Sequence, residues 1–271
     1  MLRVLTKSDI ELLFNFYQKI NRFDEIYIRQ LYEAINETKI VVGNVINNNI
    51  SSILISGIIN NDYYLESILL TKEDHEEIKD LINYAISELR RDERGLNIIY
   101  DNFPYNQLMH EIMTENGFKS NFMNLICVPD ANKIELIKPN IALNDKSDDV
   151  KLYIYKNLVE EIKVNDLYLG TDTLVPDISS IHLENTNVAT IRDNDNKVIG
   201  TLRFAIVSDS LFLDSLYADN EETYKDLITL VKNLTNKNIE INIYPSRTRV
   251  INILENLGFK KNHTNYILKL N

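Results

Sequence analysis

The sequence predicts a mixed α/β protein made of two tandem copies of one α/β unit. Short apolar strands alternate with segments of 3.6-residue apolar periodicity, Asn-rich turns separate several strands, and two sequence anchors recur in the same order in both halves. The chain has 271 residues, of which 44% are hydrophobic, ample for a core, and its length fits either one large domain or two of about 130 residues.

Two helices are expected at the start of the first half. Thr6 and Asp9 form a capping-box-like pattern, and the apolar stripe that follows predicts a helix over residues 7–21. A second amphipathic segment covers residues 25–36.

Three antiparallel strands follow. Strands are predicted at 39–46 and 50–59, joined by Asn47-Asn48-Asn49, because asparagine tolerates left-handed turn geometry. A third strand covers 63–70. The strongest helical period of the first half, over residues 71–91, then predicts a crossover to a parallel neighbour.

One more strand, helix and strand complete the half. The strand 96–100 precedes a helix over 105–116, which Gly117 ends as a C-cap residue. The strand 122–128 is expected to close the unit, and the second half is expected to repeat the same order.

A linker separates the halves. Residues 129–149 are polar, contain two prolines, and are interpreted as a linker flanking one short strand at 134–137. The predicted domains are therefore residues 1–131 and 132–271.

The internal repeat has two anchors. Leu65-Glu66-Ser67-Ile68 matches Leu213-Asp214-Ser215-Leu216, an offset of 213 − 65 = 148 residues. Glu115-Asn116-Gly117-Phe118-Lys119 matches Asn256-Leu257-Gly258-Phe259-Lys260, an offset of 258 − 117 = 141 residues. Differences in loop length account for the drift, and the shared order favours duplication.

The second anchor also carries a family resemblance. The helix that ends in Gly258-Phe259 resembles the C-terminal signature of the Gcn5-related N-acetyltransferases, with a counterpart at residues 106–118. Residues 197–204 resemble the third strand of that family. The resemblance covers most of both halves. It implies two tandem acyl-CoA N-acyltransferase folds and an enzyme that transfers an acyl group from acetyl-CoA to a small amine or amino-acid-like substrate.

The sequence departs from that family at the cofactor loop. The family binds the pyrophosphate on a Gly-rich loop at a helix start, where free N–H groups and the helix dipole attract anions. Residues 71–78 and 219–225 contain no glycine and place carboxylates there. Lys72, Lys225 and Arg247 are the basic residues that would have to compensate.

The resemblance also implies a general base on the fourth strand of each half. Glu66 and Asp214 occupy that position, where partial shielding would suit a carboxylate to proton abstraction. The tyrosine that protonates the leaving thiolate in the family is replaced by Met113 and Leu254. Its role would fall to water or to one of four other tyrosines, namely Tyr64, Tyr105, Tyr217 and Tyr244.

The second half is favoured as the active one, because Gly200 and Gly258-Phe259 match the family best. The backbone of Tyr217 and Ala218 would hold the pantetheine arm. The helix start and a basic residue would receive the pyrophosphate, and the residues expected to bind the cofactor there are Asn220, Thr223, Tyr224, Lys225 and Arg247.

Composition excludes several other classes. The formal net charge of −11 disfavours nucleic acid and anionic membranes as partners, and no window approaches the apolar length of a membrane span. Cys127 is the single cysteine, so an intramolecular disulfide is impossible and a reducing cytoplasm is expected. Histidine and cysteine spacing indicates no metal site, and hydrolase and dinucleotide motifs are missing.

Three functional hypotheses remain open. The chain is an N-acyltransferase with one active half, a non-catalytic ligand-binding or interaction module that kept the cleft and lost the cofactor loop, or a dimerisation or regulatory scaffold. Sequence alone does not predict the oligomeric state.

Overall fold

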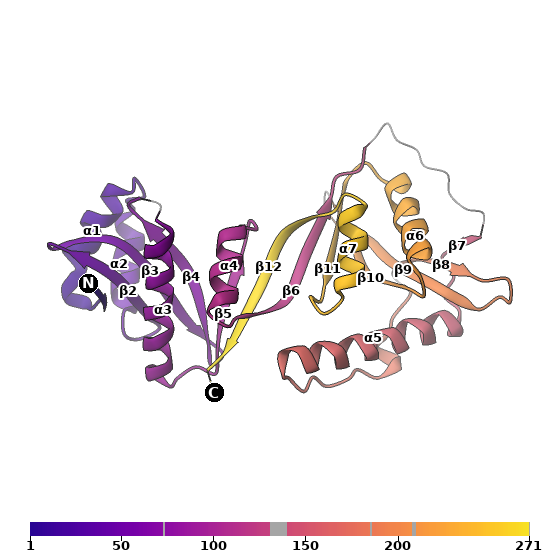
Figure 1. The fold of residues 1–271 in the computed structure, drawn as a ribbon, viewed down its shortest axis with the longest axis horizontal. Helices are drawn as coiled ribbons and strands as arrows, with labels where there is room; N and C mark the ends of the chain where they lie inside the picture. Colours follow the sequence, from indigo (N-terminus) through magenta and orange to yellow (C-terminus); the bar gives the residue numbers. More distant parts are fainter. Residues whose placement is uncertain (73, 131–139, 185, 208–209, 271) are drawn as a thin grey trace. The chain divides into compact units, whose positions relative to one another are not determined.

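The structure is a computed structural model that describes residues 1–72, 74–130, 140–184, 186–207 and 210–270 (Figure 1). The chain forms two compact units. Unit 1 contains Met1–Ser120 and Asn265–Asn271, and unit 2 contains Asn121–Thr264. The predicted domain boundary between residues 131 and 132 and the strand predicted at 134–137 lie outside the described residues.

Unit 1 is a mixed sheet with helices on both faces. Its sheet has the order β1-β2-β3-β4-β5-β12, in which β4 and β5 are parallel. Helices α3 and α4 share one apolar core with the sheet, and α1 and α2 share another. The elements of the unit are β1 (Leu2–Val4), α1 (Ile10–Lys19), α2 (Glu25–Ala34), β2 (Lys39–Ile46), β3 (Asn49–Ile59), β4 (Asp62–Leu70), α3 (His75–Asp92), β5 (Asn97–Asn102), α4 (Gln107–Glu115) and the end of β12 (Lys260–Lys269).

The tight turns of unit 1 follow the predicted chemistry. Asn47 and Asn48 connect β2 to β3 with φ values of 50° and 57°, and Asn60 and Asn61 connect β3 to β4 with 50° and 66°. Asparagine adopts this left-handed region more readily than most residues, so both hairpins are set by local sequence. Gly117, with φ of 83°, ends α4 as predicted.

Unit 2 has the same design. Its sheet has the order β6-β11-β10-β9-β8-β7, with β10 and β11 parallel. Helices α6 and α7 pack into one core and α5 into another. The elements are β6 (Lys119–Cys127), β7 (Ile141–Leu143), α5 (Asp148–Leu169), β8 (Asn187–Arg192), β9 (Val198–Val207), β10 (Ser210–Ala218), α6 (Glu221–Leu234), β11 (Asn238–Ile243), α7 (Thr248–Asn256) and the start of β12.

The predicted fold class is confirmed, since both units are mixed α/β layers with matching strand order. Two details of the prediction are wrong. The second half carries the single helix α5 and a 3-10 turn (Ile178–Ser180) where two helices were expected. The predicted linker 129–149 contains β7 and the first residues of α5, because its Asp-rich stretch is the acidic first turn of that helix.

The last strand of the first half also differs from expectation. Residues 123–127 of β6 pair antiparallel with β11, so the strand predicted at 122–128 belongs to the sheet of unit 2. In unit 1 the place beside β5 is taken by the end of the chain. There Tyr266 stacks on Tyr100 with ring centroids 6.3 Å apart, and the Leu270 N–H donates to the Leu96 carbonyl at 3.1 Å.

Candidate functional site

In unit 1 the predicted base Glu66 occupies a β-bulge. Ile55 of β3 faces Ser67, and the next residue, Ser56, faces Leu65, so Glu66 is an extra residue in β4. A bulge locally breaks the alternation of side chains and re-aims the extra one. The register therefore singles out Glu66 among the residues of its strand.

Strand β4 separates from β5 at the same point. Their parallel pairing runs from Asp62 with Asn97 to Leu65 with Tyr100. Beyond it, in the pairings of the described residues, residues 67–70 pair with β3 alone. Backbone N–H and C=O groups of the β4 edge that faces β5 are thus left to a ligand or to water.

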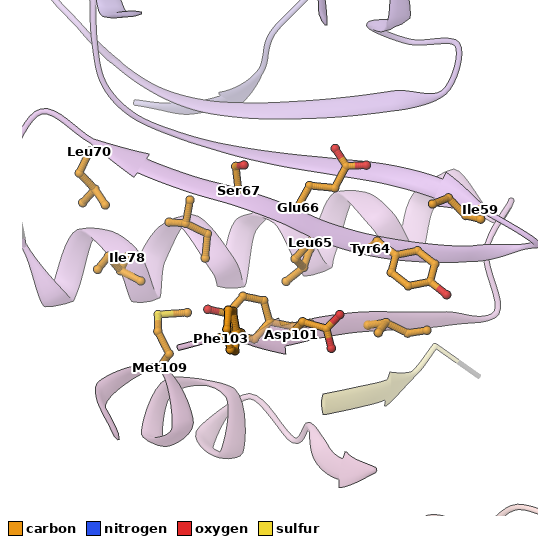
Figure 2. Close-up of a pocket in the computed structure, with 13 residues that line it drawn as sticks. Ile59, Tyr64, Leu65, Glu66, Ser67, Leu70, Ile78, Asp101, Phe103 and Met109 are labelled. Atoms are coloured by element: carbon orange, nitrogen blue, oxygen red, sulfur yellow. The ribbon is translucent and has the colours of Figure 1, made fainter. Parts of the chain in front are cut away.

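A pocket of about 550 Å³ fills this opening (Figure 2). Leu65, Ile78 and Met109 give it an apolar wall from β4, α3 and α4, and Figure 2 shows Glu66 extending from β4 toward β3, away from Asp101 on β5. The residues that line the pocket are Ile59, Tyr64, Leu65, Glu66, Ser67, Ile68, Leu70, Ile78, Ile99, Tyr100, Asp101, Phe103 and Met109.

The Glu66 carboxylate is held by an ion pair with Lys39 of β2. The two side chains are 31% and 27% exposed, so the pair is reachable from solvent. Gly57 of β3 lies beneath it, and a Cβ there would overlap Glu66 Oε1. The absence of a side chain at Gly57 therefore leaves the room that the pair occupies.

Carboxylates surround the first turn of α3, at the end of the same pocket. Asp74 is the N-cap and accepts from the N–H groups of Glu76 and Glu77 at 3.0 and 3.2 Å. Glu77 Oε1 accepts from Ser51 Oγ, from Ser52 Oγ at 2.7 Å and from Asn44 Nδ2 at 2.9 Å. Burial raises the pKa of Glu77, but these hydrogen bonds outweigh burial and hold the pKa below its usual value.

In unit 2 the same construction surrounds Asp214. Leu213 faces Phe204 and Ser215 faces Arg203, so Asp214 is the bulged residue of β10. The positions agree with the repeat, since 214 − 66 = 148. The carboxylate is half exposed and forms an ion pair of 2.7 Å with Arg203.

The opening between β10 and β11 begins after Leu213 and Ile241 and contains a buried polar cluster. Arg247 donates to the backbone carbonyl of Leu216 at 2.7 Å and pairs with Glu161 at 3.2 Å. Tyr217 donates to Glu161 at 2.7 Å, and the Arg247 guanidinium lies 5.0 Å from the Tyr217 ring centroid. The opening is thus partly filled by the chain itself.

A smaller pocket of about 400 Å³ remains beside this cluster. Phe122, Tyr217 and Tyr244 supply its aromatic wall, and Glu161 and Asp214 its carboxylates. The pKa of Tyr217 is raised, first by burial and then by the neighbouring Glu161, so its hydroxyl stays protonated and donates.

The other residues expected to bind the cofactor make contacts of their own. Asn220 caps α6 and accepts from the Thr223 N–H at 3.0 Å and the Thr223 hydroxyl at 3.1 Å. Lys225 pairs with Glu221 at 2.7 Å, and Arg247 Nη2 donates to the Tyr224 hydroxyl at 3.2 Å. Ala218 ends β10 opposite Gly200.

In both units an apolar side chain occupies the position of the replaced acid tyrosine. These side chains, Met113 and Leu254, are fully buried. Of the four alternative tyrosines, Tyr64 lines the unit 1 pocket, whereas the Tyr105 hydroxyl donates to Gln107 at 2.9 Å. Tyr217 and Tyr244 lie along the unit 2 pocket. Of these four, Tyr64 is therefore the one that lines the same pocket as Glu66.

Sequence reasoning missed Lys39, Arg203 and Glu161. Each is a long-range partner of a predicted residue, separated from it by 27, 11 and 86 positions. The pair of Lys39 with Glu66 and the pair of Arg203 with Asp214 join neighbouring strands, so strand register is a usable signal for them. Glu161 lies on α5, where nothing local marks it.

Cys127 is buried, as predicted for a small apolar residue, and burial raises the pKa of its thiol. Among the described residues, no three His, Cys, Asp or Glu side chains gather into a set able to hold a metal ion. No helix in the described part of the chain is long and apolar enough to cross a membrane.

Comparison with known proteins identifies similar structures but no similar sequence. No family model matches the chain, and no curated protein matches it. A GCN5-related N-acetyltransferase from Sphaerobacter thermophilus is 8% identical with a TM-score of 0.42, over 100% of this chain and 95% of that chain.

Two further solved structures cover almost the whole chain. A tandem GNAT protein from the clavulanic acid biosynthesis pathway is 9% identical with a TM-score of 0.37, over 100% of this chain and 98% of its own. A putative acetyltransferase from Pyrococcus horikoshii is 11% identical with a TM-score of 0.38, over 99% of this chain and 89% of its own. The architecture described above rests on the strand order and register of the chain, independently of these similarities.

Proposed function

We propose that this chain is an acyltransferase that moves an acyl group from a thioester to a small amine, and that unit 1 carries the chemistry. The observation that supports this most directly is the pocket between β4 and β5, with an unpaired strand edge on one side and the bulged carboxylate of Glu66 at its rim. Acetyl-CoA is the donor that the family resemblance implies.

The geometry favours unit 1 as the site of the reaction, whereas the sequence favoured the second half. The counterpart of Arg247 in unit 1 is position 247 − 141 = 106. Asn106 caps α4, accepting from the N–H groups of Leu108 and Met109 at 2.9 and 3.3 Å. It therefore brings no guanidinium to the opening, whereas in unit 2 Arg247 binds the backbone of Leu216.

In the proposed reaction Glu66 accepts a proton from the ammonium form of the acceptor. The free amine nitrogen then attacks the thioester carbonyl and the C–S bond breaks as the amide C–N bond forms. The second proton that the nitrogen loses passes to the thiolate through water or through the Tyr64 hydroxyl, so the thiol leaves neutral. Glu66 and Asp101 line the pocket as carboxylates, which suits a cationic acceptor.

The test is thiol release from acetyl thioesters in the presence of a panel of primary amines and amino acids. We expect Glu66→Gln to lower kcat/KM by about 10²-fold or more, the usual contribution of a general base. Glu25→Gln, which removes an exposed carboxylate from α2, serves as control. A loss with Asp214→Asn but not with Glu66→Gln would move the chemistry to unit 2.

A non-catalytic ligand-binding module is the second candidate. The carboxylates at the start of α3 and the cluster that partly fills the opening of unit 2 favour it, because both oppose binding of a nucleotide cofactor. Saturable binding of an amine or a thioester, seen as a rise in Tm without any thiol release, would support this candidate against the enzyme.

A further inference from the structure

The unit 1 pocket ends at a helix start that is already occupied by anions. Leu70 and Ile78 line the pocket where β4 ends and α3 begins. Asp74 takes the N–H groups of Glu76 and Glu77 there. These N–H groups would otherwise be the natural donors for a phosphate, since a helix N-terminus combines free donors with a favourable dipole.

A second set of donors near this turn is occupied in the same way. Two hydroxyl groups and one amide, from Ser51, Ser52 and Asn44, all converge on Glu77 Oε1. The described part of this turn carries one positive side chain, Lys72, and three carboxylates, those of Asp74, Glu76 and Glu77. Its formal net charge is therefore 1 − 3 = −2. A diphosphate placed here would meet repulsion and would have to displace the carboxylates from their donors.

At the start of α6 in unit 2, the charged side chains that could affect a pyrophosphate also have partners within the chain. Asp219 accepts from the Tyr153 hydroxyl at 2.7 Å, and Glu221 holds Lys225 at 2.7 Å. Arg247, the third basic residue that would have to compensate, is paired with Glu161. Two of the three basic side chains predicted to neutralise a pyrophosphate, Lys225 and Arg247, are therefore engaged by carboxylates of the chain.

We infer that the acyl donor of unit 1 is a neutral, amide-bearing thioester that lacks the nucleotide diphosphate. Such a chain would lie along the open edge of β4, where amide groups of an extended ligand can pair with the backbone of residues 66–70. This inference rests on the proposed function. The reaction is unchanged: one C–S bond breaks, one C–N bond forms, and the free thiol leaves with one proton.

The test compares two donors on the full chain, S-acetyl-pantetheine and acetyl-CoA, by the rate of thiol release with one fixed amine. At low salt we expect kcat/KM to be at least about tenfold higher for S-acetyl-pantetheine, a discrimination of about 1.4 kcal/mol. The ratio should shrink as salt rises, because salt screens the repulsion between the diphosphate and the carboxylates.

A double variant checks the cause. Asp74→Asn with Glu77→Gln removes two charges but keeps an N-cap side chain and an oxygen acceptor, and its Tm shows whether the fold is retained. We expect it to lower the donor ratio by about fivefold or more. Glu25→Gln removes a first-turn carboxylate from α2 and should leave the ratio unchanged.

The outcomes separate the two proposals. If acetyl-CoA is used as well as or better than S-acetyl-pantetheine, the donor inference is overturned while the proposed acyl transfer stands. If neither donor releases thiol with any amine of the panel, and neither changes the Tm, both proposals are overturned together.

Discussion

The guanidinium of Arg247 donates a hydrogen bond of 2.7 Å to the backbone carbonyl of Leu216 in the opening of unit 2. The carbonyl belongs to β10 beyond the point where its pairing with β11 ends. Unit 2 thus satisfies with its own side chain a backbone group of the strand edge whose counterpart in unit 1, on β4, borders the pocket. This difference separates two units that otherwise share strand order, bulge and parallel pair.

Arg247→Met should strongly destabilise the chain. It leaves the Glu161 carboxylate, whose side chain is 10% exposed, without its cation, and breaking a buried pair typically costs about 3–5 kcal/mol. Urea unfolding measures the change. The double variant Arg247→Met with Glu161→Leu should recover most of the loss, because no unpaired charge remains; a double variant as unstable as the single one would contradict this reading.

Gly200→Ala should destabilise unit 2 by about 1–3 kcal/mol through overpacking. A Cβ at this position would overlap Thr223 Cγ2 and lie 3.3 Å from Leu227 Cδ1. Combining Gly200→Ala with Thr223→Ser removes the methyl group and keeps the hydroxyl that donates to Asn220. Thermal unfolding should show that the double variant regains most of the lost stability. If it does not, the overlap with the Thr223 methyl group is not the cause of the loss.

Asn220→Ala should lower the free energy of unfolding by about 1 kcal/mol, the usual cost of losing a helix N-cap. Asn220 accepts from the Thr223 N–H at 3.0 Å, and Asp at this position keeps the acceptor. Asn220→Asp should therefore remain close to the wild type in urea unfolding. Equal losses for both variants would argue against a capping role.

Asp9 should make stability depend on acid pH. Hydrogen bonds from Arg3, at 2.6 and 2.8 Å, lower the pKa of Asp9 to about 2 against an opposing effect of burial. Because the folded pKa lies below the unfolded one, the stabilisation is present above about pH 4 and is lost as pH falls toward 2.

The pH-dependent difference in unfolding free energy between the wild type and Asp9→Asn should be no more than about 2 kcal/mol. Urea midpoints measured between pH 6 and pH 2 give this difference. If the difference stays constant over the whole pH range, the ion pair of Asp9 with Arg3 does not contribute to the pH dependence of stability.

Local sequence predicted much of the fold. The Asn-Asn turns adopt positive φ values, and Gly117 and Gly258 end α4 and α7 with φ values of 83° and 91°. Both features depend on the conformational preference of single residues. The repeat offset of 148 residues also placed Glu66 and Asp214 at equivalent positions, and both are bulged.

Other parts of the fold were beyond local sequence. The internal repeat predicts two helices before β8, as in the first half, whereas residues 148–169 form the single helix α5. A helix continues or stops according to what it packs against, which the repeat does not encode. The membership of β6 in unit 2 depends on its partner β11, more than 100 positions away. The apolar pattern of a strand determines which of its faces is buried, but it does not determine which of two sheets the strand joins.

What the sequence by itself determined is the alternation of strands and helices, their turns and caps, and the duplicated carboxylate in the fourth strand of each half. These follow from short-range preferences and from the period of apolar residues. Only the tertiary structure decided how far each opening is filled by side chains of the chain itself. That difference depends on Arg247 meeting Glu161 across 86 positions, and on Glu77 accepting from Asn44, Ser51 and Ser52, each at least 25 positions away. Contacts of this kind form only when packed elements bring distant side chains together, so no local pattern encodes them.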